Sequence, residues 1–269
     1  MKNFDFKKLL VFLVLIAVVG LVVFAVVKVA TKGKSANEEE LKIIEDVGLD
    51  YMARLTQGYV SDYNGVDLLY TNGEKVTYEK LSTSSILNVA SRYVSNKELD
   101  NTMSSIAVDK AKQELGTEGT NYTAYKGASI RQAVKDLFGV DFVNQSAVDE
   151  IGFGYNFYYN STYDIYLKGT SSQFAGFNYD NDVRFEISKT QSIKKGEQLK
   201  VEIAVAYTRY NEEQKRDYAK DPNGETIVVT LDEDADFPKD KLTEFDKYVI
   251  TLKKDGDNYI FDSFEKGTI

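Results

Sequence analysis

The feature that most constrains this chain is a run of nineteen residues near its start, from Leu9 to Val27, without a charge or a side-chain hydrogen-bonding group. The run reads LLVFLVLIAVVGLVVFAVV. At about 1.5 Å of rise per residue, a helix of this length spans nearly the roughly 30 Å of hydrocarbon in a bilayer. Because only a helix satisfies its own backbone groups in lipid, the sequence predicts a transmembrane helix over residues 9–30.

Signal peptides, lipoproteins and pilins also begin with an apolar run, but this run fits them less well. A cleaved signal peptide usually has an apolar core of about 7–15 residues followed by small residues. This run is longer, and Lys28 stands two positions before Ala30. A lipid-modified cysteine is excluded because the chain has no cysteine, and the glutamate expected near the start of a pilin-like helix is absent. Cleavage therefore stays the less favoured alternative to a retained anchor.

Lysines flank the apolar run on both sides, so the positive-inside rule supports the two possible orientations of the helix almost equally. They are Lys2, Lys7 and Lys8 before the run, and Lys28, Lys32 and Lys34 after it. A tail of eight residues that leads directly into the run is typical of a signal-anchor, which places residues 1–8 in the cytoplasm. We therefore expect a single-pass protein of the cell membrane, with a short linker over residues 31–36 and an extracytoplasmic domain after it. Such a short tail forms no domain, so function is expected outside.

Composition narrows the chemistry and the partners. The chain contains no histidine and no cysteine. This excludes disulfides, cysteine zinc sites and a thiol nucleophile, and it removes the commonest general base near neutral pH. The first 34 residues carry a net charge of +5 and the remaining residues −14, which together give the −9 of the whole chain. A domain this acidic is repelled by nucleic acid and by anionic lipid, so nucleic acid is not an expected partner. The membrane is expected as a partner through the anchor alone.

The chain after residue 36 shows two kinds of hydrophobic periodicity, one after the other. Over residues 37–143, apolar residues recur every three or four positions, which predicts helices. The expected helices begin at a capping box of Ser35 and Glu38, and then cover Ser82–Val94, Asn101–Leu115 and the segment from Ser129 to a C-terminal cap at Gly139.

Over residues 144–269 the period changes to two, which predicts strands. Leu199, Val201, Ile203 and Val205 are one example. Turns are expected at residues 194–197 and at Asp255-Gly256, so neighbouring strands should pair in antiparallel fashion. Helices first and strands later indicate the α+β class, here with a curved, mostly antiparallel sheet that has one buried and one more polar face.

Aromatic residues gather between Phe153 and Tyr166 and are the most suggestive candidates for a binding role. Tyr155, Phe157 and Tyr159 share the apolar parity of their strand, so they are expected in the core. Tyr158 and Tyr166 have the opposite parity. They are therefore expected to be exposed, and they are the candidates for binding a partner.

No residue set predicts catalysis, a cofactor or a metal site. Ser192 and Lys195 have the S-x-x-K spacing of penicillin-recognising enzymes, but they lie in a predicted turn and the companion motifs are absent. The acidic loops, such as residues 232–236, lack the glycine and glutamate positions of an EF-hand and are expected to be solvated turns. The 42 acidic residues do not single out a carboxylate pair for glycoside hydrolysis. We expect a protein that is not an enzyme and binds no cofactor.

Three segments carry a resemblance to a known group of proteins: KVTYEKLS (Lys75–Ser82), SIRQAVKDLFG (Ser129–Gly139) and the closing hairpin YVITLKKDGDNYIFDSFEKG (Tyr248–Gly267). With the short basic tail and the single membrane helix, the chain resembles an uncharacterised family of membrane-anchored extracytoplasmic proteins of low-GC Gram-positive bacteria and their wall-less relatives. More distantly it resembles NTF2-like and cystatin-like domains, in which a curved sheet wraps a helix. Similar domains occur in VirB8-type components of secretion machines.

The resemblance and the residues together lead to one favoured function and two alternatives. The favoured function is a non-enzymatic module at the cell envelope that binds a ligand, a protein or a polymer. One alternative is a VirB8-like subunit of a secretion or conjugation complex. The other is a cell-wall hydrolase that works through carboxylates.

Overall fold

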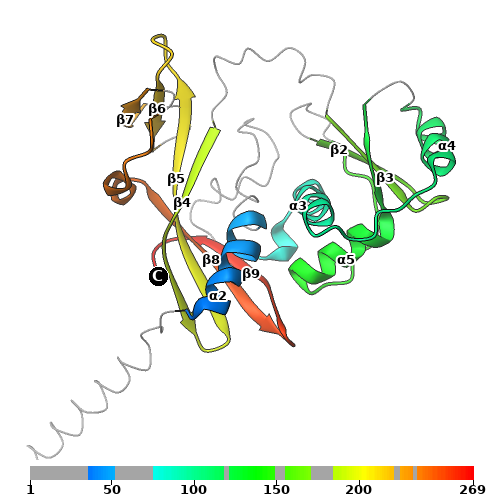
Figure 1. Cartoon of the computed structure of the whole chain (residues 1–269), viewed down its shortest axis with the longest axis horizontal. Coiled ribbons are helices and arrows are strands. Elements are labelled where there is room, and N and C mark those ends of the chain that lie inside the picture. The colour runs from blue at the N-terminus through cyan, green and yellow to red at the C-terminus, as the bar shows by residue number, and fades with distance from the viewer. Residues whose placement is uncertain are drawn as a thin grey trace, which may run out of the picture.

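The computed structural model describes residues 36–51, 75–117, 121–148, 155–170, 184–220, 225–232 and 235–269. These residues form helices and two antiparallel sheets, so the α+β class is confirmed (Figure 1). The expected tail, the membrane helix over residues 9–30 and all of the linker except residue 36 lie outside the described residues. Within the described ranges, no helix combines the length and the apolar character that a membrane crossing requires.

The α-helices lie in the segments where the periodicity predicts helices, whereas the two 3-10 turns were not predicted. In chain order they are α2 (Glu38–Ile43), the π-helix η1 (Ile44–Tyr51) that continues it, the 3-10 turn η4 (Tyr78–Lys80), α3 (Thr83–Asn96), α4 (Ser105–Leu115), α5 (Gly127–Phe138) and the 3-10 turn η7 (Lys239–Glu244). One detail of the prediction is wrong, because the capping box of α2 lies two residues later than expected. The Asn37 side chain accepts from the Glu40 amide at 2.9 Å, and the Glu40 carboxylate accepts from the Asn37 amide at 2.9 Å. Asparagine is as good an N-cap as serine.

The larger sheet is built around one long strand. Its strands are β4 (Arg184–Lys195), β5 (Gln198–Tyr210), β6 (Arg216–Ala219), β7 (Ile227–Leu231), β8 (Asp246–Asp255) and β9 (Asn258–Lys266). The order is β7-β6-β5-β8-β9, and β4 pairs with the other edge of β5. Both predicted hairpins are confirmed. Each turn has a glycine with positive φ at its first central position, Gly196 at +62° and Gly256 at +59°, as type II′ turns favour.

The smaller sheet joins the two halves of the chain. Its order is β1 (Thr123–Lys126), β3 (Ile165–Thr170) and β2 (Tyr155–Asn160). Strand β1 lies inside the segment 37–143 that was expected to be helical, and it pairs with β3 from the expected sheet segment. Four residues are too few for a period of two to stand out in the sequence.

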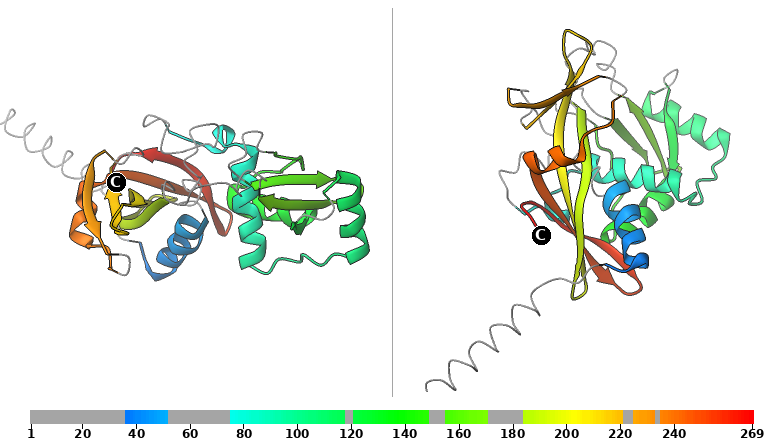
Figure 2. Two further views of the ribbon diagram at one scale, coloured as in Figure 1. Left: turned by 90° about the horizontal axis from the view of Figure 1, so that it is seen from above. Right: turned by 60° about the vertical axis from the view of Figure 1, so that its left-hand side comes forward.

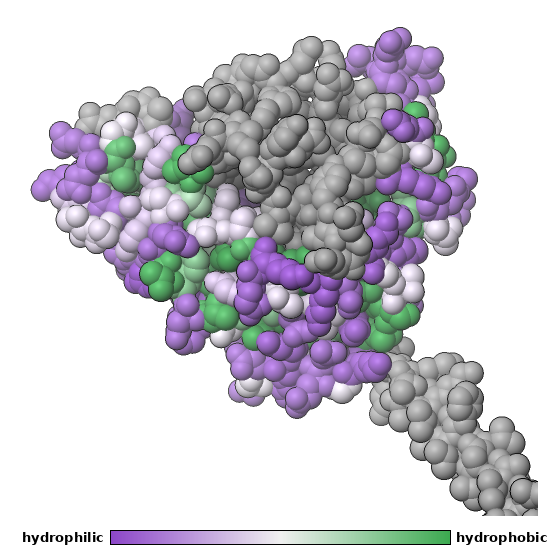
Figure 3. Space-filling model, turned by 180° about the vertical axis from the view of Figure 1, so that it is seen from behind, coloured by the Kyte–Doolittle hydropathy of each residue, from purple (hydrophilic) through white to green (hydrophobic). Residues whose placement is uncertain are grey.

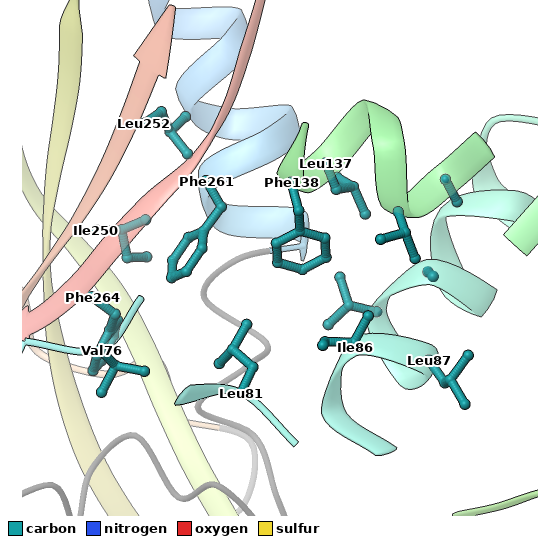
Figure 4. Packing of buried hydrophobic residues seen from close by; sticks show 14 of the residues in the cluster. Val76, Leu81, Ile86, Leu87, Leu137, Phe138, Ile250, Leu252, Phe261 and Phe264 are labelled. Carbon is teal, nitrogen blue, oxygen red and sulfur yellow. The ribbon is translucent and has the colours of Figure 1, made fainter. Parts of the chain in front are cut away.

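One hydrophobic core runs through both sheets. Helices α3 and α5 lie between them (Figures 1 and 2). Helix α5 packs against β9 of the larger sheet and β1 of the smaller one, α3 packs against β2, and η1 packs against β5, β8 and β9. The rings of Phe138 in α5 and Phe261 in β9 meet edge to face at 5.8 Å (Figure 4). Helix α4 covers the far face of the small sheet. The two predicted parts of the domain therefore share their interior.

At several strand edges, the backbone donors and acceptors are hydrogen-bonded by side chains or by isolated bridges. The Asn101 side chain donates to the Ala124 carbonyl at 3.1 Å and accepts from the Lys126 amide at 2.7 Å, as a neighbouring strand would do for β1. Ala147 forms a bridge to Phe157 on the edge of β2. An exposed edge invites another chain to pair with it, so these contacts protect the small sheet.

Candidate functional site

Polar side chains meet around Asp164, at the end of the turn between β2 and β3. Its carboxylate accepts two hydrogen bonds from Arg131 at 2.9 and 3.1 Å, one from the Tyr159 hydroxyl at 2.9 Å and one from the Asn144 amide at 3.1 Å. The backbone of Asp164 is left-handed, with φ +53°. Aspartate tolerates this conformation better than most residues, which explains why the turn can end here.

The Asp164 carboxylate also caps helix α5 from another part of the chain. The N-cap residue of α5, Lys126, makes no side-chain capping bond. Instead, the Gly127 amide donates to the Asp164 carbonyl at 2.6 Å, and the Ala128 amide donates to the carboxylate. A negative charge is favourable at a helix N-terminus. Burial acts to raise the pKa of Asp164, but the bonds from Arg131, Tyr159 and Ala128 outweigh it and hold the pKa below its ordinary value.

Tyr166, predicted to be exposed, is fully buried. Its ring lies 4.8 Å from that of Tyr159, between centroids. Its hydroxyl accepts from the Gln145 amide at 3.0 Å and donates to Asn144 Oδ1 at 3.3 Å. Burial raises its pKa above the ordinary value. The ring and the hydroxyl are thus both engaged inside the fold, and the expectation of an exposed Tyr166 is wrong.

The register of the hairpin explains this error. Asn160 pairs with Ile165 across a four-residue turn, so odd residues of β2 pair with even residues of β3, such as Tyr159 with Tyr166. Directly opposite residues share one face of a sheet. Phe157 and Tyr166 therefore enter the same core next to α3 and α5, and the core position of Phe157 is confirmed.

The opposite face of the small sheet is covered as well. Ile165 and Leu167 are buried there against α4. Tyr158, the other candidate for partner binding, is half-buried on this face, and its ring meets that of Tyr122 edge to face at 5.9 Å. Burial raises the pKa of Tyr158. Parity does not separate buried from exposed residues in a sheet that is covered on both sides.

Lys168 is the most strongly perturbed cation of the domain. Its Nζ donates to Asn88 Oδ1 at 2.8 Å and to Ser91 Oγ at 3.1 Å, and it lies 5.4 Å from the centroid of the Phe157 ring. Burial lowers the pKa of Lys168 to about 8, and the charge of Arg92 acts in the same direction. The sequence gives no signal for this cluster, because a single lysine in a strand is expected to reach water.

A serine beside a lysine with a lowered pKa can act as a nucleophile in principle. Here Ser91 is fully buried, and its hydroxyl donates to the Asn88 carbonyl at 2.9 Å. A nucleophile needs access to its substrate, which this position does not offer. The contact therefore holds β3 to α3.

A third polar cluster lies on the face of the large sheet that points away from the helices. Glu202 in β5 is 3% exposed, and it accepts from Thr190 Oγ1, from Gln191 Nε2 at 2.8 Å and from the Ile269 amide at 3.0 Å. Lys247 Nζ lies 3.6 Å away. Burial acts to raise the pKa of Glu202, but these hydrogen bonds lower it overall. The cluster ties the last residues of the chain to the central strand.

The remaining sequence candidates lie apart from these clusters. Ser192 was expected in the turn but lies within β4, whereas Lys195 ends that strand beside the turn. Asp255 and Asp257 flank the exposed turn at Gly256. Among the residues that the structure describes, no three acidic side chains come together in a way that could hold a metal ion.

Comparison of the chain with protein families, with curated proteins and with solved structures finds no match. The function must therefore be argued from the residues of the chain itself.

Proposed function

We propose that the protein is a single-pass membrane protein whose extracytoplasmic α+β domain is a non-enzymatic binding module at the cell envelope. The observation that carries the proposal is the apolar run from Leu9 to Val27, followed by a domain with one continuous core. Such a run prefers hydrocarbon to water, and a domain with its own core can fold beside the membrane. The partner is an envelope protein or polymer.

The polar clusters make contacts inside the fold, which supports a binding role over catalysis. Asp164, Lys168 and Glu202 each bind partners from another element of the fold. A catalytic acid or base must instead be directed toward a substrate. The three clusters are better explained as supports that fix helices and strands in place.

The kind of α+β fold is also part of this proposal. We propose an NTF2-like or cystatin-like arrangement, in which a sheet wraps a helix. It is supported by the docking of α2 and η1 on the large sheet, where Ile44 is fully buried and Lys189 pairs with Glu45 at 3.2 Å. No fold comparison adds to this support, so it rests on packing alone.

Membership of the membrane-anchored family of low-GC Gram-positive bacteria is likewise a proposal. The three segments that carry the resemblance meet inside the molecule. Phe138 of α5 contacts the Tyr78 ring at 5.3 Å and the Phe261 ring at 5.8 Å, and Val76 bridges to Phe264 (Figure 4). The aromatic and aliphatic residues of the three segments are therefore packing residues, and a relationship to this family would rest on a common core.

Exposed apolar residues are the first places to look for the partner contact. Val143 is 82% exposed and Val148 46% exposed, both on the segment that follows α5 and borders β2. On the face that Figure 3 shows, the coloured surface is mainly hydrophilic, with separate apolar areas. Ile106 on α4 is another exposed apolar residue, at 66%. Exposed apolar side chains gain most when a partner removes them from water.

The test is mild crosslinking on intact cells, followed by recovery of the full chain. We expect one or a few crosslinked products, and we expect the double variant Val143→Asp/Val148→Asp to lose them. Ile227→Asp is the matched control, because Ile227 is 45% exposed on a different part of the surface. If no product with a protein or a polymer is recovered, the binding role is wrong.

A further inference from the structure

We infer that the end of the large sheet formed by the β4–β5 and β8–β9 turns faces the bilayer, where Lys195 and Lys254 contact anionic lipid headgroups. This inference rests on the proposed membrane anchor. It adds an orientation for the domain and a lipid-binding surface, which we call the hairpin end and define as residues 187–200 and 247–258.

The start of α2 lies at the hairpin end. Glu40, in the first turn of α2, forms an ion pair with Lys194 at the end of β4. The Lys254 amide donates to the Glu197 carbonyl at 2.9 Å, so the two hairpin turns lie side by side. Figures 1 and 2 show the start of α2 and both turns at the same end of the molecule.

The length of the chain keeps this end close to the anchor. Nine residues, 28–36, separate the apolar run from Asn37, the N-cap of α2. Fully extended, they span at most about 32 Å, at up to about 3.6 Å per residue. Strand β5 leads away from the hairpin end for thirteen residues. At about 3.3 Å per residue, its far end lies roughly 40 Å further along the sheet.

The distribution of charge also favours the hairpin end as the end that faces the membrane. Residues 211–246, which follow β5 in the chain and contain the strands β6 and β7 beside its far half, hold twelve acidic and five basic side chains. The hairpin end holds seven lysines and three acidic side chains. Residues 36–45 add four glutamates and one lysine, and two of these glutamates, Glu40 and Glu45, are paired with lysines of β4. Residues 201–205 of β5 and 259–266 of β9 pair at the same level and add one basic and three acidic side chains. This end of the sheet together with residues 36–45 therefore sums to −1, and residues 211–246 sum to −7.

An anionic surface attracts lysines beside an anchor and repels acidic regions within about 10 Å at 0.1 M salt. Lys195 and Lys254 are both exposed, and neither pairs with an acidic group in the part of the chain that the structure describes. Their side chains are long enough to reach phosphate oxygens, although Glu197, Asp255 and Asp257 share the turns. The length of the tether and the distribution of charge thus both indicate that the hairpin end faces the membrane.

The absence of cysteine makes a direct test possible, because a single introduced cysteine takes one label. Glu197→Cys and Asp257→Cys place a fluorophore at the hairpin end, and Glu212→Cys and Asp240→Cys place it in the acidic region. The full chain is reconstituted into phosphatidylglycerol vesicles that contain a lipid with a nitroxide on its headgroup. We expect strong quenching at positions 197 and 257 and little at 212 and 240.

The lipid contact is tested by charge reversal. Lys195→Glu/Lys254→Glu should lower the quenching at position 257 to the level seen at 212, whereas Lys110→Glu/Lys239→Glu, with the same change in charge elsewhere, should not. Phosphatidylcholine vesicles should abolish the difference between the two double variants. Equal quenching at all four labelled positions in a chain that floats with vesicles would overturn the orientation alone. A chain that does not float with vesicles would overturn the anchor as well.

Discussion

The two sheets of this domain use the same strand periodicity in different surroundings. In the large sheet, Leu199, Val201 and Ile203 of β5 are buried on the face of the helices. Glu202, Ala204 and Ala206 are buried on the other face, where no long helix lies and where Tyr218 and Phe245 cover the two alanines. In the small sheet, helices cover both faces, so residues of either parity are buried. Alternation therefore reports which residues share a face. It reports exposure only where one face remains open to water.

Polar groups mark the second difference between the sheets. Around the small sheet, Asp164 and Lys168 bind side chains of helices α5 and α3. On the large sheet, Glu202 binds the neighbouring strand β4 and the end of the chain. Changes near the small sheet should therefore disturb helix docking, and changes near Glu202 should disturb strand pairing and the terminus. The following predictions test this comparison, beginning with the largest effect.

Gly127→Ala should be the most damaging single change near the small sheet. A Cβ at this position would lie 2.0 Å from Asp164 Oδ1 and 2.7 Å from Asn144 Nδ2. Asp164 would have to move away from the start of α5. We therefore expect a loss of about 3 kcal/mol or more in the free energy of unfolding, measured by denaturant titration. Gly116→Ala is the control. A Cβ at Gly116 would meet no atom within 4 Å, and only the φ of +65° disfavours alanine there. This change should therefore cost about 1–2 kcal/mol.

Glu202→Gln should have the next largest effect, about 2–3 kcal/mol, because it removes the charge from a buried, hydrogen-bonded carboxylate. The pKa of Glu202 is lowered in the fold, so its stabilisation is present above the unfolded pKa of about 4.3 and is lost as the pH falls through the folded pKa. The variant should therefore lose part of the acid dependence of unfolding. An unchanged acid limb between pH 5 and pH 2 would show that the Glu202 cluster does not stabilise the large sheet.

How much could be predicted from sequence depended on how local the signal was. Helices α3 and α5 and the turns at Gly196 and Gly256 follow from patterns within a few residues. The Asp164 cluster does not, because Arg131 and Asn144 lie 33 and 20 positions away in the chain. The burial of Tyr166 depended on the register set by the four-residue turn, which puts Tyr166 opposite Tyr159 on the face of Phe157. The parity within one strand does not encode that register.

Lys168→Met should produce a smaller effect that depends on pH. The pKa of Lys168 is lowered to about 8 in the fold, so between pH 8 and the unfolded pKa of about 10.4 the unfolded chain binds more protons than the folded one. Stability from this group therefore rises with pH across that window, by about 1–2 kcal/mol. Unfolding of the variant at pH 7.5, 9 and 10 should lack this rise. Lys110→Met, at an exposed position on α4, should keep it.

The two tyrosines give the smallest and most direct test of the parity argument. Tyr166→Phe removes a hydroxyl with two partners in the core and should cost about 1–1.5 kcal/mol. Tyr158→Phe should cost less than about 0.5 kcal/mol, because the Tyr158 side chain is only half-buried. Equal costs, measured by thermal unfolding of both variants, would mean that the two hydrogen bonds of the Tyr166 hydroxyl add nothing to stability.

Protease treatment of intact cells tests the central claim, that the domain stands outside the membrane on a retained anchor. We expect external protease to degrade the domain while a cytoplasmic marker survives, and we expect the full chain to stay with the membrane after alkaline carbonate extraction. A domain that resists protease until the cells are broken, or a chain recovered from the medium without its first 30 residues, would contradict this claim.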